Sequence, residues 1–377
     1  MTSTSMSKSK MIHLTLLKAS SHLPTAFIFR IQEIHHTLEL TTQPGLKRVR
    51  SIIMTSIALP RRTRITSPTS VVQLEYSPDP LPKPASTPNG ETWTRFVLLS
   101  DTHSRTFPVP DGDVLLHSGD LCRRGTLRDL RRTMEWLYAL PHPLKIIIAG
   151  NRDYALDREW YDANWNQTIP AGKEPVWEPP EPVFELLTGP RAKAANIVYL
   201  KDEEYKFRAQ PGGREWSVYG SPLSPNFGSR VRAFGYDAAD AEAVVSSFPQ
   251  TDILLTHGGP LKILDLTKKG VRAGCHALTA RLPTLQPRLH VFGHIHEARG
   301  AYVHLWSRTH RLSLGAQNSV QMGLEAMDVG DEVVSEGEQT IFVNAANTPA
   351  GQNEFRNGEP VDAGGPGVQP VVVDLRE

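Results

Sequence analysis

Short apolar runs alternate with amphipathic stretches along the chain from residue 94 onward. The runs at 95–100, 113–117 and 145–149 are mostly apolar, which is typical of strands buried on both faces. Further strands are expected at 196–200, 216–220, 252–256, 289–292, 340–344 and 371–374. Turn residues and helical stretches separate these runs, so the pattern predicts an α/β fold.

The clearest helical stretch covers residues 127–140. Apolar residues fall on one face of this stretch, as they do in a helix that packs on a sheet: Leu127, Leu130, Met134, Leu137 and Tyr138. Thr126 is the expected N-cap, because its hydroxyl can accept from a free backbone N–H of the first turn. Helices are also expected at 238–247 and 275–285, and a loop is expected in the Trp- and Pro-rich segment 160–190.

Five polar motifs each begin where an apolar strand ends. They are Asp101-Thr102-His103, Gly119-Asp120, Gly150-Asn151-Arg152-Asp153, His257-Gly258-Gly259 and Gly293-His294-Ile295-His296. In α/β sheets, the loops beyond the carboxyl ends of the strands converge on one crevice. The sequence therefore predicts that these motifs meet in space.

Carboxylate, imidazole and amide groups make up the motifs, and thiolate is absent from them. This donor set suits Mn, Fe or Zn ions rather than a cysteine-based structural zinc site. Two neighbouring cations need an anion between them, and Asp120 at a strand end is the candidate for that bridge. His117 precedes the second motif on the strand itself, so we expect it to be a hydrogen-bonded core histidine.

Residues from about 93 to 377 resemble the calcineurin-like metallophosphoesterase superfamily, and most closely its metallophosphoesterase domain-containing group. The stretches that carry this resemblance are Ser100–Thr106, His117–Leu121, Gly220–Pro222, Leu289–Glu297, Phe342–Ala345 and Pro370–Leu375. The resemblance implies a four-layer αββα sandwich of the metallo-dependent phosphatase type. It also implies two divalent metal ions and hydrolysis of phosphoesters by a hydroxide that bridges the metals.

The resemblance also assigns the metal ligands. It implies one ion held by Asp101, His103, Asp120 and His296, and a second ion held by Asp120, Asn151, His257 and His294. Members of this group act on phosphodiesters, with cyclic nucleotides among their substrates. Asn151 would additionally offer its amide to a phosphate oxygen.

Arg152 departs from the family pattern, in which Gly-Asn is followed by a histidine that helps to protonate the leaving oxygen. Arginine does not donate a proton at neutral pH, but it can hold a phosphate through two hydrogen bonds. Loss of a general acid lowers rates by roughly a hundredfold to ten-thousandfold. Arg152 is therefore read either as a phosphate-binding replacement or as a sign that catalysis has decayed.

The leading hypothesis is a metal-dependent phosphodiesterase for small nucleotide-like substrates. The alternative is a catalytically weakened metal- and nucleotide-binding protein that acts through a partner. The formal net charge of +1 gives no strong nucleic-acid signal, and no apolar run is long enough to cross a membrane, so a soluble protein is expected. The oligomeric state is left open.

Residues 1–70 differ in composition from the rest of the chain, with ten Lys or Arg against two acids and many Ser and Thr. This pattern allows a mitochondrial transit peptide, a disordered tail, or an assigned start that lies upstream of a true start at Met54. A proline-rich linker follows at 77–89. We expect residues 1–90 to contribute nothing to the core and residues 91–377 to form the domain. A cytoplasmic location is expected, with mitochondria as the alternative.

Overall fold

The computed structural model describes residues 63–77, 81–86, 90–167, 178–226, 232–306, 339–349, 355–356 and 359–377. By its contacts the chain divides into a unit of residues 1–60 and a unit of residues 61–377. The expectations for residues 1–60 lie outside the described residues. All that follows concerns the second unit.

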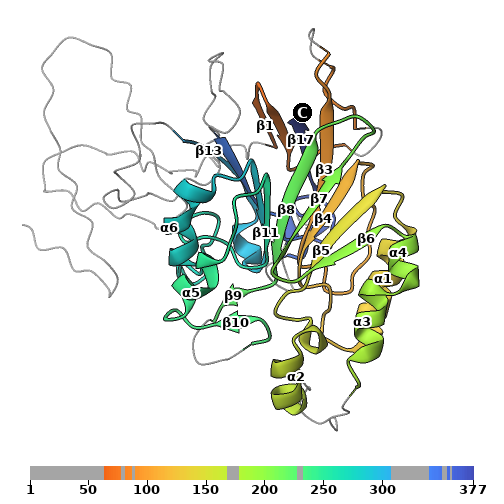
Figure 1. The fold of residues 1–377 in the computed structure, drawn as a ribbon, viewed down its shortest axis with the longest axis vertical. Helices are drawn as coiled ribbons and strands as arrows, with labels where there is room; N and C mark the ends of the chain where they lie inside the picture. The colour runs from red at the N-terminus through yellow and green to blue at the C-terminus, as the bar shows by residue number, and fades with distance from the viewer. Residues whose placement is uncertain are drawn as a thin grey trace, which may run out of the picture. The chain divides into compact units, whose positions relative to one another are not determined.

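A seven-stranded mixed sheet forms one half of the fold (Figure 1). In spatial order its strands are β1 (Arg64–Ser67), β2 (Ser70–Gln73), β17 (Val371–Arg376), β3 (Trp93–Leu99), β4 (Val114–Ser118), β5 (Leu144–Ile148) and β6 (Ile197–Leu200). Strands β3 to β6 are parallel, whereas β17 is antiparallel to both β3 and β2. The parallel strands bring their carboxyl ends to the same edge of the sheet.

A six-stranded sheet forms the other half. Its strands are β13 (Gly300–Leu305), β14 (Gln339–Asn344), β12 (Leu289–Phe292), β11 (Ile253–Thr256), β8 (Glu215–Ser221) and β7 (Glu203–Arg208). The four inner strands are parallel, and the antiparallel strands β13 and β7 form the two edges. The four inner strands agree with strands predicted from the sequence. The two edge strands are not predicted by it.

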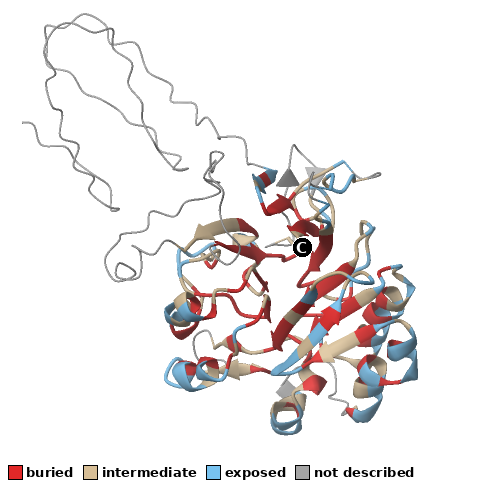
Figure 2. Cartoon of the chain, turned by 45° about the horizontal axis from the view of Figure 1, so that its top comes forward, coloured by how far each residue is buried: buried red, intermediate tan, exposed pale blue. Residues whose placement is uncertain are grey.

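The two sheets pack face to face, and their inner surfaces form the main apolar core. Phe96 and Leu116 of the first sheet and Trp216 and Val291 of the second belong to this core and are fully buried. The rings of Phe96 and Trp216 meet edge to face with centroids 5.2 Å apart. In the burial-coloured view the strands are largely buried, and the helices expose their outer faces (Figure 2).

Helices cover the outer face of each sheet. On the first sheet lie α1 (Leu127–Ala139), α3 (Glu181–Thr188) and α4 (Pro190–Ala194), and on the second lie α5 (Ala241–Ser246) and α6 (His276–Leu285). The layer order is therefore αββα, which confirms the predicted fold class. Among the described residues, no helix has the length and apolar character needed to cross a membrane.

Helix α1 forms as its sequence predicts. The Thr126 hydroxyl accepts a hydrogen bond from Asp129 N, and the Leu130, Met134 and Leu137 side chains are buried against the sheet.

Smaller elements complete the fold: α2 (Arg158–Asn164), β9 (Ser224–Pro225), β10 (Gly235–Tyr236), β15 (Phe355–Arg356), β16 (Glu359–Pro360), and 3₁₀ turns at Tyr154–Leu156, Trp165–Gln167 and His296–Ala298. The expectation of a loop throughout 160–190 is wrong, because α3 and most of α2 lie in that segment.

The domain begins earlier than predicted. Strands β1 and β2 form a hairpin that pairs with β17, and Val71, Val72 and Leu74 are buried. The proline-rich stretch is also attached, since the buried Arg95 side chain donates to the carbonyl oxygens of residues 81 and 82 at 2.6 and 3.0 Å. The prediction that residues up to 90 contribute nothing to the core is therefore wrong for residues 64–74.

This correction predicts the effect of truncation. A chain that begins at Arg61 should keep the melting temperature of the full chain. A chain that begins at Glu91 should melt roughly 10 °C or more lower, because a buried Val or Leu side chain contributes about 1.5–3 kcal/mol. Thermal unfolding followed by circular dichroism measures both, and equal melting temperatures for the two variants would show that the hairpin is dispensable.

Candidate metal centre

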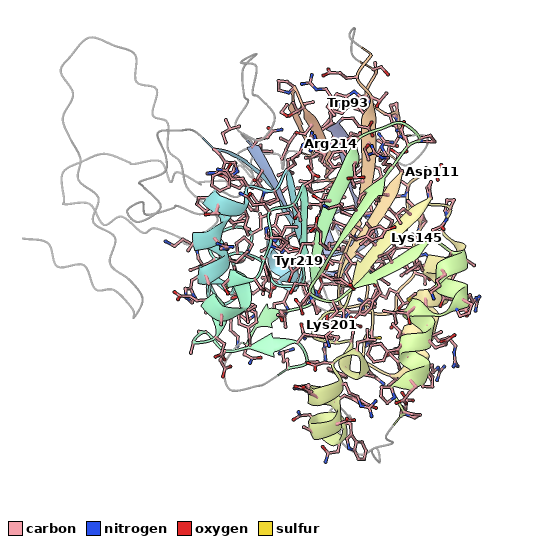
Figure 3. All side chains as sticks on the ribbon, in the orientation of Figure 1. Trp93, Asp111, Lys145, Lys201, Arg214 and Tyr219 are labelled. Atoms are coloured by element: carbon pink, nitrogen blue, oxygen red, sulfur yellow. The ribbon has the colours of Figure 1, made fainter. Side chains whose placement is uncertain are left out.

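The five motifs meet at one end of the sandwich. Trp93, at the start of β3, and Arg214, just before β8, lie toward one end, and Lys201, just after β6, lies toward the other (Figure 3). The motifs follow β3, β4, β5, β11 and β12 at the end marked by Lys201. The carboxyl ends of strands from both sheets therefore bring residues nearly two hundred positions apart into contact.

One ligand group consists of Asp101, His103 and His296. Their donor atoms all lie within 4.8 Å of one another. His296 Nε2 is 3.1 Å from Asp101 Oδ1 and 3.3 Å from His103 Nε2. Three ligand atoms at these separations can surround a single cation.

A second group consists of Asp101, Asp120 and His257, with donor atoms again within 4.8 Å. Asn151 joins it, because its Oδ1 lies 3.1 Å from His257 Nε2 and 2.7 Å from His294 Nδ1. The structure thus brings together all of the predicted metal ligands. The two groups adjoin at the buried carboxylates.

The orientation of the histidines fits metal binding. The Nδ1–H of His103 donates to the carbonyl oxygen of Cys122 at 3.0 Å, and the Nδ1–H of His257 donates to that of Ser118 at 2.9 Å. These bonds hold each ring so that Nε2 faces the other ligand atoms, as backbone partners commonly do for metal-binding imidazoles. The residues present therefore fit a site for divalent cations.

The backbone is strained where it presents these ligands. Positive φ angles occur at Asp101 (52°), His103 (46°), Asp120 (56°) and His294 (67°), a region that side chains other than glycine rarely adopt. Asp101 N donates to Gly119 O at 2.9 Å, and His103 N donates to Asp120 O at 3.1 Å. Such strain persists where surrounding contacts fix the geometry, and it is concentrated at functional sites.

Asp153 ties two of the ligand loops together, a role that the sequence did not reveal. Its buried carboxylate accepts hydrogen bonds from Leu121 N at 3.1 Å, Cys122 N at 2.7 Å and Gly150 N at 2.8 Å. Burial, followed by the nearby charge of Asp120, raises the pKa of Asp153 to about 7. The loop after β4 and the loop after β5 are thereby held in one arrangement.

The ligands border a cavity of about 280 Å³. Its lining residues are His103, Asp120, Asn151, Arg152, Arg232, Thr267, His294, Ile295 and His296. The backbone N–H of Arg152 donates to Asp120 Oδ1 at 2.7 Å, and its Nη1 donates to Tyr154 Oη at 3.0 Å. Arg232 and Thr267 were missed from the sequence because no local motif marks them. The cavity therefore combines metal ligands with two cationic side chains.

The charges in the cluster favour a cation beside the carboxylates. Burial lowers the pKa of His103 below its ordinary value and that of His294 to about 3, which leaves both rings neutral. Burial also lowers the pKa of His296, but the charge and hydrogen bond of the Asp101 carboxylate have the larger combined effect and raise this pKa to about 9. His296 in turn holds the pKa of Asp101 well below its usual range against the effect of burial.

His117 is a structural histidine, as predicted. It is fully buried, it accepts from Gly119 N at 3.2 Å, and its Nε2 lies 3.0 Å from Thr102 Oγ1. Desolvation lowers the pKa of His117 to about 3. The neutral ring thus links the first two motifs without adding a charge.

Comparison with known proteins agrees with this geometry. The family model for the calcineurin-like phosphoesterase matches residues 94–298, a range that includes all of the ligand residues described above. The chain belongs to this family.

Relatives with curated descriptions include metallophosphoesterase domain-containing protein 1 of Homo sapiens and of Mus musculus. Each is 40% identical over 233 residues, which cover 59% of this chain and 66% of the relative. The match thus spans slightly less than two thirds of these relatives. "Probable rhamnogalacturonate lyase C" of Emericella nidulans is 33% identical over 219 residues, 58% of this chain but 18% of that protein. A solved Thermus thermophilus structure aligns over 56% of this chain and 85% of its own with 15% identity, and its TM-score of 0.34 supports no conclusion.

The role of Asp153 leads to a testable prediction. Asp153→Ala leaves three backbone N–H groups without their acceptor, at a cost of about 1–3 kcal/mol each. We expect a clear loss of thermal stability together with a roughly 10- to 100-fold loss of Mn²⁺ affinity, which is typical when an outer partner of a metal site is removed.

Asp157→Ala is the matched control. Asp157 also accepts from two backbone N–H groups, those of Trp160 and Phe234, but it is not part of the ligand cluster. This variant should lose stability and keep its Mn²⁺ affinity in isothermal titration calorimetry. Equal Mn²⁺ affinities in the two variants would contradict the assigned role of Asp153.

Proposed function

We propose that the protein is a phosphodiesterase that acts on small nucleotide-like substrates through a pair of divalent cations, either Mn, Fe or Zn. The observation that carries this proposal is the convergence of two ligand groups on one cavity that also contains Arg152 and Arg232. A cavity of about 280 Å³ suits a phosphate and part of one attached group.

The first ligand set implied by the resemblance contains the group Asp101, His103 and His296. The second set shares Asp120 and His257 with the other group, which also includes Asp101. Asp101, His103 and His296 would hold one ion, and Asn151, His257 and His294 the other. The Asp120 carboxylate would bridge them, which is supported by the separations of Oδ2 from His103 Nε2, 3.8 Å, and of Oδ1 from His257 Nε2, 3.4 Å. When bound, the ions would activate water and neutralise the charge that develops on the phosphate.

Asn151 and Arg152 would act on the substrate itself. Asn151 turns its Oδ1 toward two imidazoles, which leaves Nδ2 as a donor to a phosphate oxygen. The Arg152 guanidinium, held by Tyr154, can bind a phosphate through a charge-assisted pair of hydrogen bonds. Because arginine stays protonated, the leaving group must depart without a proton from this residue.

The alternative function is a metal- and nucleotide-binding protein with weak catalysis, and Arg152 is the observation that favours it. Turnover of bis-p-nitrophenyl phosphate by the purified full chain, with and without added Mn²⁺, separates the two. The phosphodiesterase requires metal-dependent release of p-nitrophenol. Stoichiometric Mn²⁺ binding without turnover would support the alternative.

The bridging role of Asp120 predicts a specific loss of metal. Asp120→Asn should reduce the bound metal from about two ions per chain to one or none and abolish turnover, because the amide cannot neutralise two adjacent cations. Asp111→Asn makes the same change of charge at an exposed position and should keep both ions. Metal analysis of the two dialysed variants measures this, and two retained ions in the Asp120 variant would exclude the bridge.

Arg152 predicts a dependence on the leaving group. Aryl diesters should be hydrolysed well and ribose esters slowly, because a phenolate needs little protonation. Arg152→His should raise kcat for a cyclic nucleotide by roughly 10- to 100-fold more than for the aryl diester, within the range that general acid catalysis supplies.

Arg152→Lys is the control for this prediction, since it keeps a cation but restores no acid near neutral pH. It should not improve hydrolysis of the cyclic nucleotide. Both variants are compared with the natural chain at equal metal occupancy. If histidine gives no selective gain on the poor leaving group, another residue already serves as the acid.

A further inference from the structure

A second polar cavity, of about 330 Å³, lies at the start of helix α1. Its lining residues are Arg124, Thr126, Arg128, Asp129 and Arg132. The two helical arginines are four residues apart, so they lie on the same face of α1 about 6 Å apart along its axis. Arg124 continues this row on the segment that leads into the helix. We call these three residues the arginine row.

The arginine row lacks counterions within the part of the chain that the structure describes. Two other exposed arginines do have them: Arg158 pairs with Asp162 and Glu181, and Arg191 pairs with Glu135. No side-chain ion pair with a described residue involves Arg124, Arg128 or Arg132. Three like charges that border one cavity without a described acidic partner form a site for an external anion.

The acidic groups beside the cavity are engaged elsewhere. Asp129 Oδ2 accepts from Arg124 N at 2.8 Å, and Glu178 Oε2 accepts from Leu127 N at 2.7 Å. Both carboxylates therefore satisfy backbone N–H groups at the beginning of α1 rather than guanidinium groups. The guanidinium groups remain available for a ligand.

The row directly adjoins the metal centre. Gly125, the next residue after Arg124, packs so tightly on the neighbouring loop that a Cβ there would come within 2.2 Å of the Tyr154 ring and 2.9 Å of the Arg152 carbonyl oxygen. Tyr154 in turn holds the Arg152 side chain, which lines the metal-site cavity. Gly125 and Tyr154 therefore link the segment that carries Arg124 to the loop that carries Arg152.

We infer that the arginine row binds additional phosphate groups of the substrate, and that the natural substrates are short single-stranded oligonucleotides rather than mononucleotides. This inference rests on the proposed phosphodiesterase function and specifies its substrate class. One phosphodiester occupies the metal centre while neighbouring phosphates contact Arg124, Arg128 and Arg132. The near-neutral charge of the whole chain does not oppose this, because the row is local.

Equilibrium binding tests the site independently of catalysis. The probes are fluorescein-labelled dithymidylate, trithymidylate and hexathymidylate, whose anisotropy is followed with EDTA present so that no hydrolysis occurs. Affinity should rise with the number of phosphates. Counted for the arginine row alone, three phosphate contacts predict that affinity for hexathymidylate falls roughly 18-fold between about 50 and 200 mM salt, from a slope of about −0.7 per contact.

The variant Arg128→Gln/Arg132→Gln leaves one contact, so the fall should shrink to about threefold and the dependence on length should disappear. Arg131→Gln is the control, because Arg131 is exposed on the same helix but does not line the cavity. It should bind oligonucleotides like the natural chain. All three proteins should turn over bis-p-nitrophenyl phosphate equally.

The inference is overturned if the double variant binds hexathymidylate like the natural chain, or if Arg131→Gln weakens binding as much as the double variant does. Absence of bis-p-nitrophenyl phosphate turnover in every protein would instead contradict the proposed function, while the anisotropy still reports on the row. Thermal unfolding of each variant is the control for the fold, and these exposed substitutions should leave the melting temperature unchanged.

Discussion

Two buried carboxylates placed side by side are the constraint on which this structure depends. Asp101 and Asp120 are 0% and 3% exposed, and their oxygen atoms lie within 4.8 Å of each other and of His257. Unpaired buried charges of the same sign are strongly unfavourable unless positive charge or hydrogen bonds compensate them. Backbone N–H groups and the His296 imidazole offset part of this charge, and a bound divalent cation would offset more. The remaining ligands are arranged around this requirement.

Buried strands of the two sheets position the ligands around these carboxylates. Five central strands of the two sheets end at the site. Each is followed by a short loop whose backbone is held by hydrogen bonds. The Asp153 carboxylate joins two of these loops through three N–H groups. Positive φ at four ligand residues is the conformational cost of aiming their side chains inward. The apolar core between the two sheets stabilises the strands that carry these loops.

The sequence was sufficient to predict the inner strands and the ligand cluster, because both depend on local signals. Apolar runs mark buried parallel strands, and a polar motif at the end of each run marks the shared edge. The β1–β2 hairpin escaped prediction because its strands have four residues each and are buried by β17, some three hundred positions later. Edge strand β7 has two apolar residues among four charged ones, and β13 does not alternate between buried and exposed positions, so neither stands out in the sequence.

Features that depend on tertiary contacts could not be predicted. Asp153 stands in a recognisable motif, but two of its three backbone partners, Leu121 and Cys122, belong to another loop that only the fold brings close. The spacing of Arg124, Arg128 and Arg132 is visible in the sequence, yet the engagement of Asp129 and Glu178 with backbone N–H groups is not. Arg232 reaches the metal-site cavity from a segment without any motif.

Anomalous scattering from crystals grown with Mn²⁺ tests the central claim most directly. The account predicts two anomalous peaks, one beside His103 and His296 and one beside His257 and His294, with the Asp120 carboxylate between them. A single peak, or two peaks that do not share Asp120, would contradict a dinuclear centre built on this carboxylate.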